Sequence, residues 1–101
     1  MIIRVWTAEA TPDGAAKTEA RFAEQKLPEL RRLDGFRGAT LLRRLVGDRV
    51  ELVLLTRWQS MESIRAFAGD DINLAVVAED AKEILTRFDE HVRHYEVALE
   101  D

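Results

Sequence analysis

The chain has 101 residues, a length typical of one domain built around one hydrophobic core. Hydrophobic residues make up 47% and charged residues 34%, which excludes collagen-like repeats and long disordered chains. The formal net charge is -4, so the basic surface of a nucleic-acid binder or of a binder of anionic membranes is absent. We therefore expect neither nucleic acid nor a membrane as a partner.

The sequence contains no cysteine, which excludes disulfides, thiolate nucleophiles and cysteine-based zinc or iron–sulfur sites. The apolar run at the N-terminus is interrupted by Arg4, so no signal peptide is recognisable. No apolar stretch approaches the roughly 18 residues needed to span a bilayer. These observations predict a cytoplasmic protein whose single domain covers residues 1–101.

The first half of the chain begins with a predicted strand over residues 2–8, rich in β-branched and aromatic side chains. From Ala15, alanine and leucine residues recur at intervals of three and four, which predicts an amphipathic helix. Pro28 lacks the amide proton of a helical hydrogen bond, so we expect a kink or a restart near Leu27. Gly35 lies in the turn after this helix.

Two further strands are predicted over residues 36–46 and 50–58. The turn residues Gly47 and Asp48 separate them, which indicates an antiparallel hairpin. Side chains alternate along a strand, so the second strand presents apolar residues on both faces. One face carries Leu52, Leu54, Thr56 and Trp58, and the other carries Val53 and Leu55.

The second half begins with Ser60 as a candidate N-cap of a short helix that ends at Gly69. A second helical stretch is predicted from Asp70 to about Asp89, because Ala81, Ile84, Leu85 and Phe88 follow a helical spacing. A last strand is expected from about residue 91 to residue 99.

The order strand, helix, strand, strand, helix, strand predicts an α+β ferredoxin-like βαββαβ fold with a four-stranded antiparallel sheet. Its helices can cover only one face of the sheet. The other face carries apolar residues such as Val53 and Leu55, which are costly to leave in water. The simplest cover is the same surface of a second copy, so we expect a homodimer with its sheets packed face to face.

Four short segments resemble the antibiotic biosynthesis monooxygenase (ABM) domain family of dimeric α/β barrel proteins. They are Leu33-Asp34-Gly35-Phe36, Trp58-Gln59-Ser60-Met61-Glu62, Phe67-Ala68-Gly69-Asp70 and His94-Tyr95-Glu96-Val97. The resemblance extends over nearly the whole chain. It implies a dimeric barrel whose relatives include cofactor-free oxygenases, quinol oxidases, heme-degrading enzymes and an isomerase.

The resemblance also allows a comparison with the heme-degrading branch, which uses an asparagine on the first strand, a tryptophan and a helical histidine. The tryptophan corresponds to Trp58, whereas Thr7 and Val77 stand at the other two positions. A valine cannot coordinate iron, so we expect no heme. The resemblance to the cofactor-free oxygenases implies that no other cofactor is needed.

The cofactor-free oxygenases imply a pocket that holds a small phenolic, anthrone or quinol-type aromatic, removes a proton and transfers an electron to oxygen. For this role the candidate catalytic residues are Trp58 as an aromatic wall, His94 as a proton acceptor and Thr7 as an orienting hydroxyl. The candidate substrate-binding residues are Tyr95, Leu54 and Phe67. Since neighbours on a strand point in opposite directions, His94 and Tyr95 are not expected to face the same pocket.

Purely structural interpretations stay open for these residues. Core packing alone explains Trp58, and a surface position beside Glu96 explains His94. His91 and His94 are three residues apart on one predicted strand and face opposite ways, so no metal site is predicted. Two other functions also stay open, a non-catalytic carrier or sensor of a small aromatic and an isomerase of a small metabolite.

Overall fold

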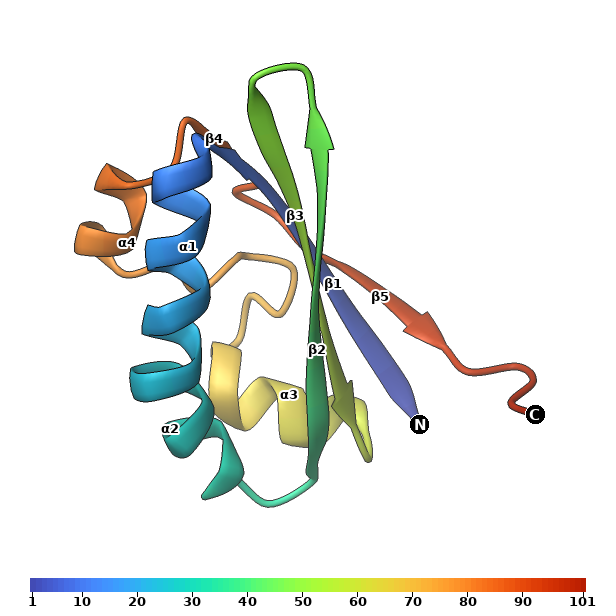
Figure 1. Cartoon of the computed structure of the whole chain (residues 1–101). Coiled ribbons are helices and arrows are strands. Elements are labelled where there is room, and N and C mark those ends of the chain that lie inside the picture. Colours follow the sequence, from blue (N-terminus) through green and yellow to red (C-terminus); the bar gives the residue numbers. More distant parts are fainter.

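The computed structural model describes all residues 1–101 and has the predicted α+β ferredoxin-like fold. Figure 1 shows all helices on the same side of the sheet, with the other side left free of helices. The elements are β1 (Ile2–Ala10), α1 (Pro12–Arg21), the π-helix η1 (Phe22–Lys26), α2 (Leu27–Arg31), β2 (Phe36–Val46), β3 (Arg49–Trp58), α3 (Met61–Ala68), α4 (Glu79–Glu83), β4 (Arg87–Phe88) and β5 (Arg93–Glu96).

The sheet is antiparallel, with β3 and then β2 on one side of β1 and the short strands β4 and β5 on the other. β4 pairs with the end of β1 at Ala8 and Glu9, and β5 pairs with its beginning from Ile2 to Val5. The expected last strand over residues 91–99 was therefore wrong in its bounds. Two short strands together occupy the fourth place in the sheet.

The first helical layer contains the predicted irregularity. The backbone N–H of Leu27 donates to the carbonyl of Phe22, five residues earlier, instead of the usual four. Pro28 follows directly and has no N–H to donate, so a regular helical ladder cannot pass through this point. The chain accommodates it by a π-helical turn and continues as α2, which confirms the predicted restart near Leu27.

The hairpin of β2 and β3 forms around Gly47, which has φ +63°, and its register runs from Val46 opposite Arg49 down to Phe36 opposite Trp58. Ser60 caps α3 as predicted, since its side chain accepts from the amide of Ser63. Both local predictions depend on turn and cap chemistry within a few residues.

The prediction of a long second helix from Asp70 to about Asp89 was wrong. Only Glu79–Glu83 is helical, and residues 70–78 form an irregular segment. Phe88 belongs to β4 opposite Ala8, and both Phe88 and Leu85 pack against the core from outside a helix. The spacing of Leu85 and Phe88 reflects their contact with that core. Pairing with β1 determines the backbone conformation of Phe88.

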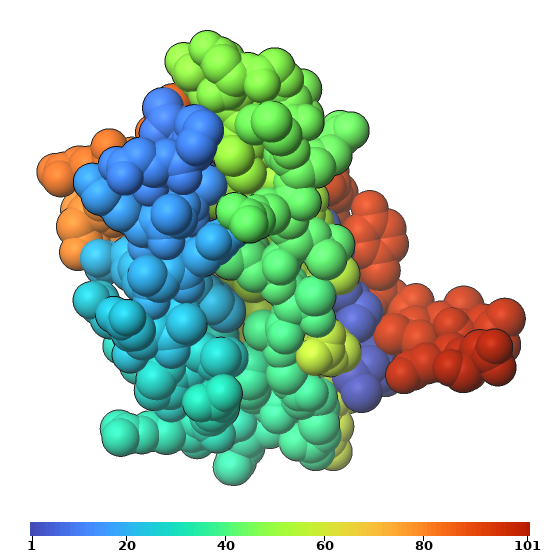
Figure 2. All heavy atoms as spheres, viewed as in Figure 1, coloured from blue at the N-terminus to red at the C-terminus, as the bar shows by residue number.

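The core lies between the sheet and the helices in two clusters. One is centred on Ala8, Ala10, Ala15, Val50 and Leu52, and the other on Leu30, Trp58 and Ile64. Figure 2 shows the helical layer packed closely along β2, with the C-terminal residues projecting away from the body. No helix is both long and apolar enough to cross a membrane.

The opposite side of the sheet, which we call the open face, has no covering layer in the protomer (Figure 1). Tyr95 is 53% exposed and Leu42 48% exposed on this face. By strand alternation and register the apolar residues of the open face are Ile3, Val5, Leu42, Val46, Val53, Leu55 and Tyr95. The predicted two-sided apolar sheet is thus present.

Candidate active site

A cavity of about 210 Å³, which we call the helix-side cavity, lies between the sheet and the helical layer. Eleven of its 18 lining residues are hydrophobic. They are Arg4, Trp6, Thr18, Arg21, Phe22, Gln25, Lys26, Glu29, Leu30, Leu54, Thr56, Phe67, Ala75, Val76, Val77, Ala78, Ala81 and Val92. The volume lies below the roughly 300–1,000 Å³ of typical drug-sized pockets, so the cavity suits a small ligand.

Three aromatic side chains from three elements contribute to its walls. Trp6 comes from β1, Phe22 from the start of η1 and Phe67 from α3. The indole N–H of Trp6 is held by the carbonyl of Asp89 at 2.9 Å, which fixes the orientation of the ring. Rigid aromatic surfaces of this kind favour stacking with a planar ligand.

Arg4 places a cation in the cavity wall although its side chain is almost completely buried, with the residue 5% exposed. Nη1 donates to the carbonyl of Ile72 at 2.6 Å and Nη2 to the carbonyl of Leu74 at 2.9 Å. The guanidinium also lies over the ring of Phe67, 5.6 Å from its centroid. These contacts tie β1 to the irregular segment that closes the cavity.

The charge of Arg4 has no carboxylate partner within ion-pairing distance. Burial lowers the pKa of this guanidinium, but an arginine keeps its charge in proteins. A buried cation without a carboxylate is costly, since its removal from water is offset here only by two carbonyl dipoles, the ring of Phe67 and a lone pair of His94.

His94 contacts Arg4 directly. Its Nε2 lies 3.0 Å from Arg4 Nη1, and because arginine can only donate, Nε2 must be the acceptor. The imidazole is then neutral with its proton on Nδ1. Burial, followed by the charge of Arg4, lowers the pKa of His94. The lone pair expected to accept a substrate proton is therefore occupied by Arg4, and His94 does not line the cavity.

This contact predicts an acid dependence of stability. The unfolded chain binds a proton at His94 below about pH 6.5, whereas the folded chain binds it only at lower pH. The free energy of unfolding should therefore decrease as the pH falls below about 6.5. Urea denaturation across that range measures it. His94→Gln should flatten the decrease, whereas a matched change at the exposed His91 should keep it. An equal slope in His94→Gln would contradict the assignment.

The mouth of the cavity carries charged side chains from the helical layer. Arg21 pairs with Asp80 at 2.6 Å, and Lys26 lies 3.8 Å from Glu29. Together with Arg4, the lining has three cations and one carboxylate. Asp80 offsets Arg21 and Glu29 offsets Lys26, so the charge of the wall that has no carboxylate beside it is that of Arg4. A single positive charge in an apolar wall favours a negatively charged group on a ligand.

Two of the sequence candidates lie at the cavity. Leu54 on β3 and Phe67 on α3 both line it. The structure does not place Trp58 there as an aromatic wall. Trp58 is fully buried, stacked on Phe67 at 5.4 Å and edge-on to Phe36 at 5.3 Å. Trp58 is thus a core residue, and it supports the cavity wall by packing against Phe67.

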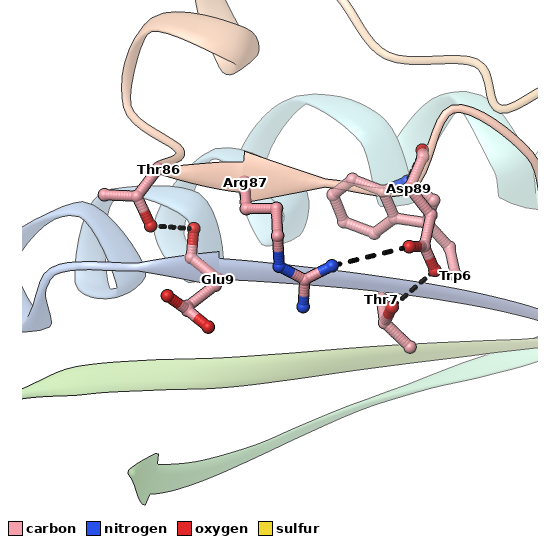
Figure 3. Close-up of polar contacts among 6 residues, drawn as sticks. All are labelled: Trp6, Thr7, Glu9, Thr86, Arg87 and Asp89. Carbon is pink, nitrogen blue, oxygen red and sulfur yellow. Dashed lines mark hydrogen bonds and ion pairs between the residues drawn. The ribbon is translucent and has the colours of Figure 1, made fainter. Parts of the chain in front are cut away.

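Thr7 and Tyr95 lie on the open face, away from the cavity. Figure 3 shows Thr7 meeting the carboxylate of Asp89, to which its hydroxyl donates, with Arg87 3.7 Å from the same carboxylate. Thr7 follows Trp6 directly, and since Trp6 faces the cavity, Thr7 points the other way. Thr7 and Tyr95 therefore cannot touch a ligand in the cavity of their own protomer, which corrects the expectation from the sequence.

Arg4 and Trp6 are the site residues that the sequence did not single out. Both occupy the inward positions of β1, two residues apart. A charged residue at an inward position of an apolar strand was the available signal.

A heme in this cavity would need an axial ligand for its iron. None of the lining residues is histidine, cysteine, methionine or tyrosine, and Val77 lies in the wall. The wall therefore lacks the side chains that usually serve as axial ligands of heme iron. The donor set does not fit that group.

Comparisons with known proteins agree with this architecture. Among solved structures, a Bacillus cereus protein assigned to antibiotic biosynthesis monooxygenases is 19% identical with a TM-score of 0.73, covering 100% of this chain and 94% of that one. The heme-degrader MhuD from Mycobacterium tuberculosis, solved with two hemes bound, is 25% identical with a TM-score of 0.65, covering 100% and 99%. A Streptomyces coelicolor monooxygenase in complex with Nanaomycin D is 16% identical with a TM-score of 0.64, covering 99% and 91%.

A search of curated proteins returned no match. The family description "Antibiotic biosynthesis monooxygenase" matches residues 1–79, a span that includes β1, the hairpin and most of the residues around the cavity. The chain belongs to the antibiotic biosynthesis monooxygenase family.

Proposed function

We propose that the chain is a cofactor-independent monooxygenase that oxidises a small phenolic, anthrone or quinol-type aromatic in the helix-side cavity. The observation that carries the proposal is an apolar, aromatic-walled cavity with one buried, uncompensated cation, Arg4. The Streptomyces monooxygenase of similar fold was solved with a small molecule bound, which supports a small-molecule ligand.

The chemistry needs only the substrate and dioxygen. An anthrone loses a proton to give an anion, and this anion transfers one electron to oxygen. The resulting radical and superoxide combine, and loss of water from the peroxide gives the quinone. One oxygen atom enters the product and the other leaves as water. The substrate itself supplies the electrons, so no metal or flavin enters the balance.

The protein contributes positioning and charge. Trp6 and Phe67 provide flat surfaces for the ring, and Arg4 provides a positive charge where the anion forms. A preorganised donor in a water-poor site stabilises developing negative charge more strongly than water does. Holding the ring still also lowers the entropic barrier to reaction with oxygen.

Oxygen uptake tests the proposal. Purified protein is mixed in air with a panel of anthrones, naphthols and hydroquinones, with a chelator present, and both oxygen and absorbance are followed. We expect at least one member to be oxidised with one oxygen molecule consumed per substrate. Unchanged oxygen throughout the panel, together with unchanged absorbance, would reject the oxygenase.

A non-catalytic carrier or sensor is the second candidate. It is favoured by one observation: the Nε2 of His94 is engaged by Arg4, so the cavity has no free histidine base. Binding without oxygen uptake, followed by fluorescence of the cavity-lining Trp6, would favour this function. The same observation weighs against an isomerase, because an isomerase on this scaffold needs a histidine that exchanges protons with the ligand.

We also propose that two copies pack through their open faces. The apolar side chains of the open face are continuous across β1, β3 and β5, and 48–53% of Leu42 and Tyr95 is exposed in the protomer. Burial against a second copy would remove this apolar area from water. A second sheet there would also cover the Thr7–Asp89 pair (Figure 3).

Leu55→Glu should prevent this association, because it places an unpaired charge in the middle of the open face. Size-exclusion chromatography with light scattering is expected to give a dimer for the natural chain and a monomer for this variant. Leu45→Glu is the matched control, since Leu45 is 69% exposed and faces the helix side of the sheet. A natural chain that is monomeric at micromolar concentration would contradict the proposal.

A further inference from the structure

The interior of the helix-side cavity lacks a side chain that could act as a general base. Its ionisable lining groups are Arg4 on β1, Arg21 on α1, Lys26 in η1 and Glu29 on α2. Three of these are cations. The Glu29 side chain is 72% exposed at the mouth and lies beside Lys26. No ionisable side chain from β3, α3 or residues 75–78 faces the interior.

His94 cannot fill this gap in the observed arrangement. Its acceptor nitrogen receives a hydrogen bond from Arg4, and the ring is outside the cavity lining. Taking up a proton at Nε2 would leave two positively charged donors 3.0 Å apart. The group beside the ligand is therefore a fixed cation, and the histidine behind it holds that cation in place.

Arg4 retains hydrogen-bonding capacity for a ligand. An arginine has five N–H donors, and the observed partners use three, on Nη1 and Nη2. Nε has no hydrogen-bond partner in the protomer. Every fully buried polar side-chain atom has a partner, so Nε is not fully buried. The Nε edge of the guanidinium is therefore not sealed off, and Arg4 is one of the residues that line the cavity.

We propose that the cavity binds its aromatic ligand as an oxyanion, a phenolate or an enolate. The charge of Arg4 favours ionisation of the ligand and replaces a general base. His94 is the positioning residue that holds Arg4 in place. The inference rests on the proposed function only in the choice of an aromatic hydroxyl compound. The ligand's O–H proton goes to solvent water, and its oxygen then accepts hydrogen bonds from the guanidinium.

The expected size of the effect follows from the charges on the cavity wall. An opposite charge within about 4–6 Å lowers the pKa of an acid by about 1–3 units. Each unit corresponds to about tenfold tighter binding of the anion relative to the neutral acid. Arg21 and Lys26 act in the same direction, but Asp80 lies 2.6 Å from Arg21 and Glu29 lies 3.8 Å from Lys26, so these pairs contribute little beyond Arg4. Apolar walls strengthen the attraction to Arg4 because they exclude water.

The experiment uses para-nitrophenol, whose anion and neutral form have separate absorption bands and which needs no oxygen to report. Its pKa when bound is compared with its pKa in buffer. Binding of para-nitroanisole, the methyl ether that cannot ionise, is measured in parallel by quenching of tryptophan fluorescence. We expect the bound pKa to fall by at least one unit, and the anion to bind at least tenfold more tightly than the ether.

Four variants identify the groups responsible. Arg4→Met should abolish the preference for the anion while binding of the ether persists, and Arg4→Lys should keep part of it. His94→Gln offers another acceptor to Arg4 and should keep the preference, whereas His94→Leu should weaken it. Arg57→Met is the matched control, because Arg57 faces the open side and donates to Thr40. Circular dichroism and ether binding verify that each variant is folded.

The result that overturns the inference is a bound pKa equal to or above the value in buffer. An anion preference that survives in folded Arg4→Met would also overturn the inference. If that variant does not fold, the pKa of para-nitrophenol bound to the natural chain still decides the question. The oxygenase is judged separately. If the protein prefers the anion but no compound of the panel causes oxygen uptake, the oxygenase is rejected and the oxyanion-binding cavity is retained. If oxygen is taken up but the anion is not preferred, the oxygenase is retained and the oxyanion-binding cavity is rejected.

Discussion

Trp58→Ala is expected to lower the free energy of unfolding by about 3–5 kcal/mol, the range for truncating a buried aromatic residue. The side chain is fully buried and packs against Phe36 and Phe67, and its indole N–H donates to Thr56 Oγ1 at 2.9 Å. Truncation leaves a void and an unpaired hydroxyl below the cavity wall. Urea denaturation followed by circular dichroism measures the loss.

Trp58→Phe is the matched control, since it keeps an aromatic ring between Phe36 and Phe67 and loses only part of the volume and the bond to Thr56. We expect a clearly smaller loss of stability and ligand affinity within a few-fold of the natural chain. If Trp58→Phe kept full stability but lost ligand binding, Trp58 would contact the ligand and the core assignment would be wrong.

Arg4→Met is expected to lower kcat/KM for the oxidised aromatic by about 100- to 1000-fold, the usual cost of removing one preorganised donor from a site of developing negative charge. Methionine retains an apolar side chain of similar length on β1, so the change removes mainly charge and hydrogen bonds. The contacts to the carbonyls of Ile72 and Leu74 are lost as well. Oxygen uptake at saturating and limiting substrate separates kcat from KM.

Arg57→Met again serves as the control, because this arginine lies on the next strand and faces the other side of the sheet. Its activity should remain within about twofold of the natural chain, as is usual for a site away from the chemistry. A folded Arg4→Met with undiminished kcat/KM would remove the buried cation from the mechanism.

Much of the fold could be predicted from the sequence because it depends on interactions between residues close together in the chain. The alternation from Leu52 to Trp58 predicted the two faces of β3, and Gly47 predicted the hairpin. The capping hydroxyl of Ser60 and the break before Pro28 were also found where the sequence placed them. Each of these features is determined by neighbours within about four residues.

The errors concern features that depend on pairing with distant strands. Phe88 has helical spacing from Ala81, yet its backbone pairs with Ala8, about 80 positions earlier in the chain. His94 faces inward because its register on β1 places it beside Arg4, and no local pattern specifies that register. The site depends on such long-range contacts, so Arg4 emerged only from the structure.

Labelled dioxygen gives the most direct test of whether the helix-side cavity is an oxygenase site. The natural protein is freed of metals with a chelator and mixed with the best substrate of the panel under isotopically labelled oxygen gas in ordinary water. Mass spectrometry then locates the label. The account predicts one labelled atom in each product molecule, at a rate that falls steeply in Arg4→Met. Product oxygen drawn from water, or a reaction no faster than without protein, would contradict it.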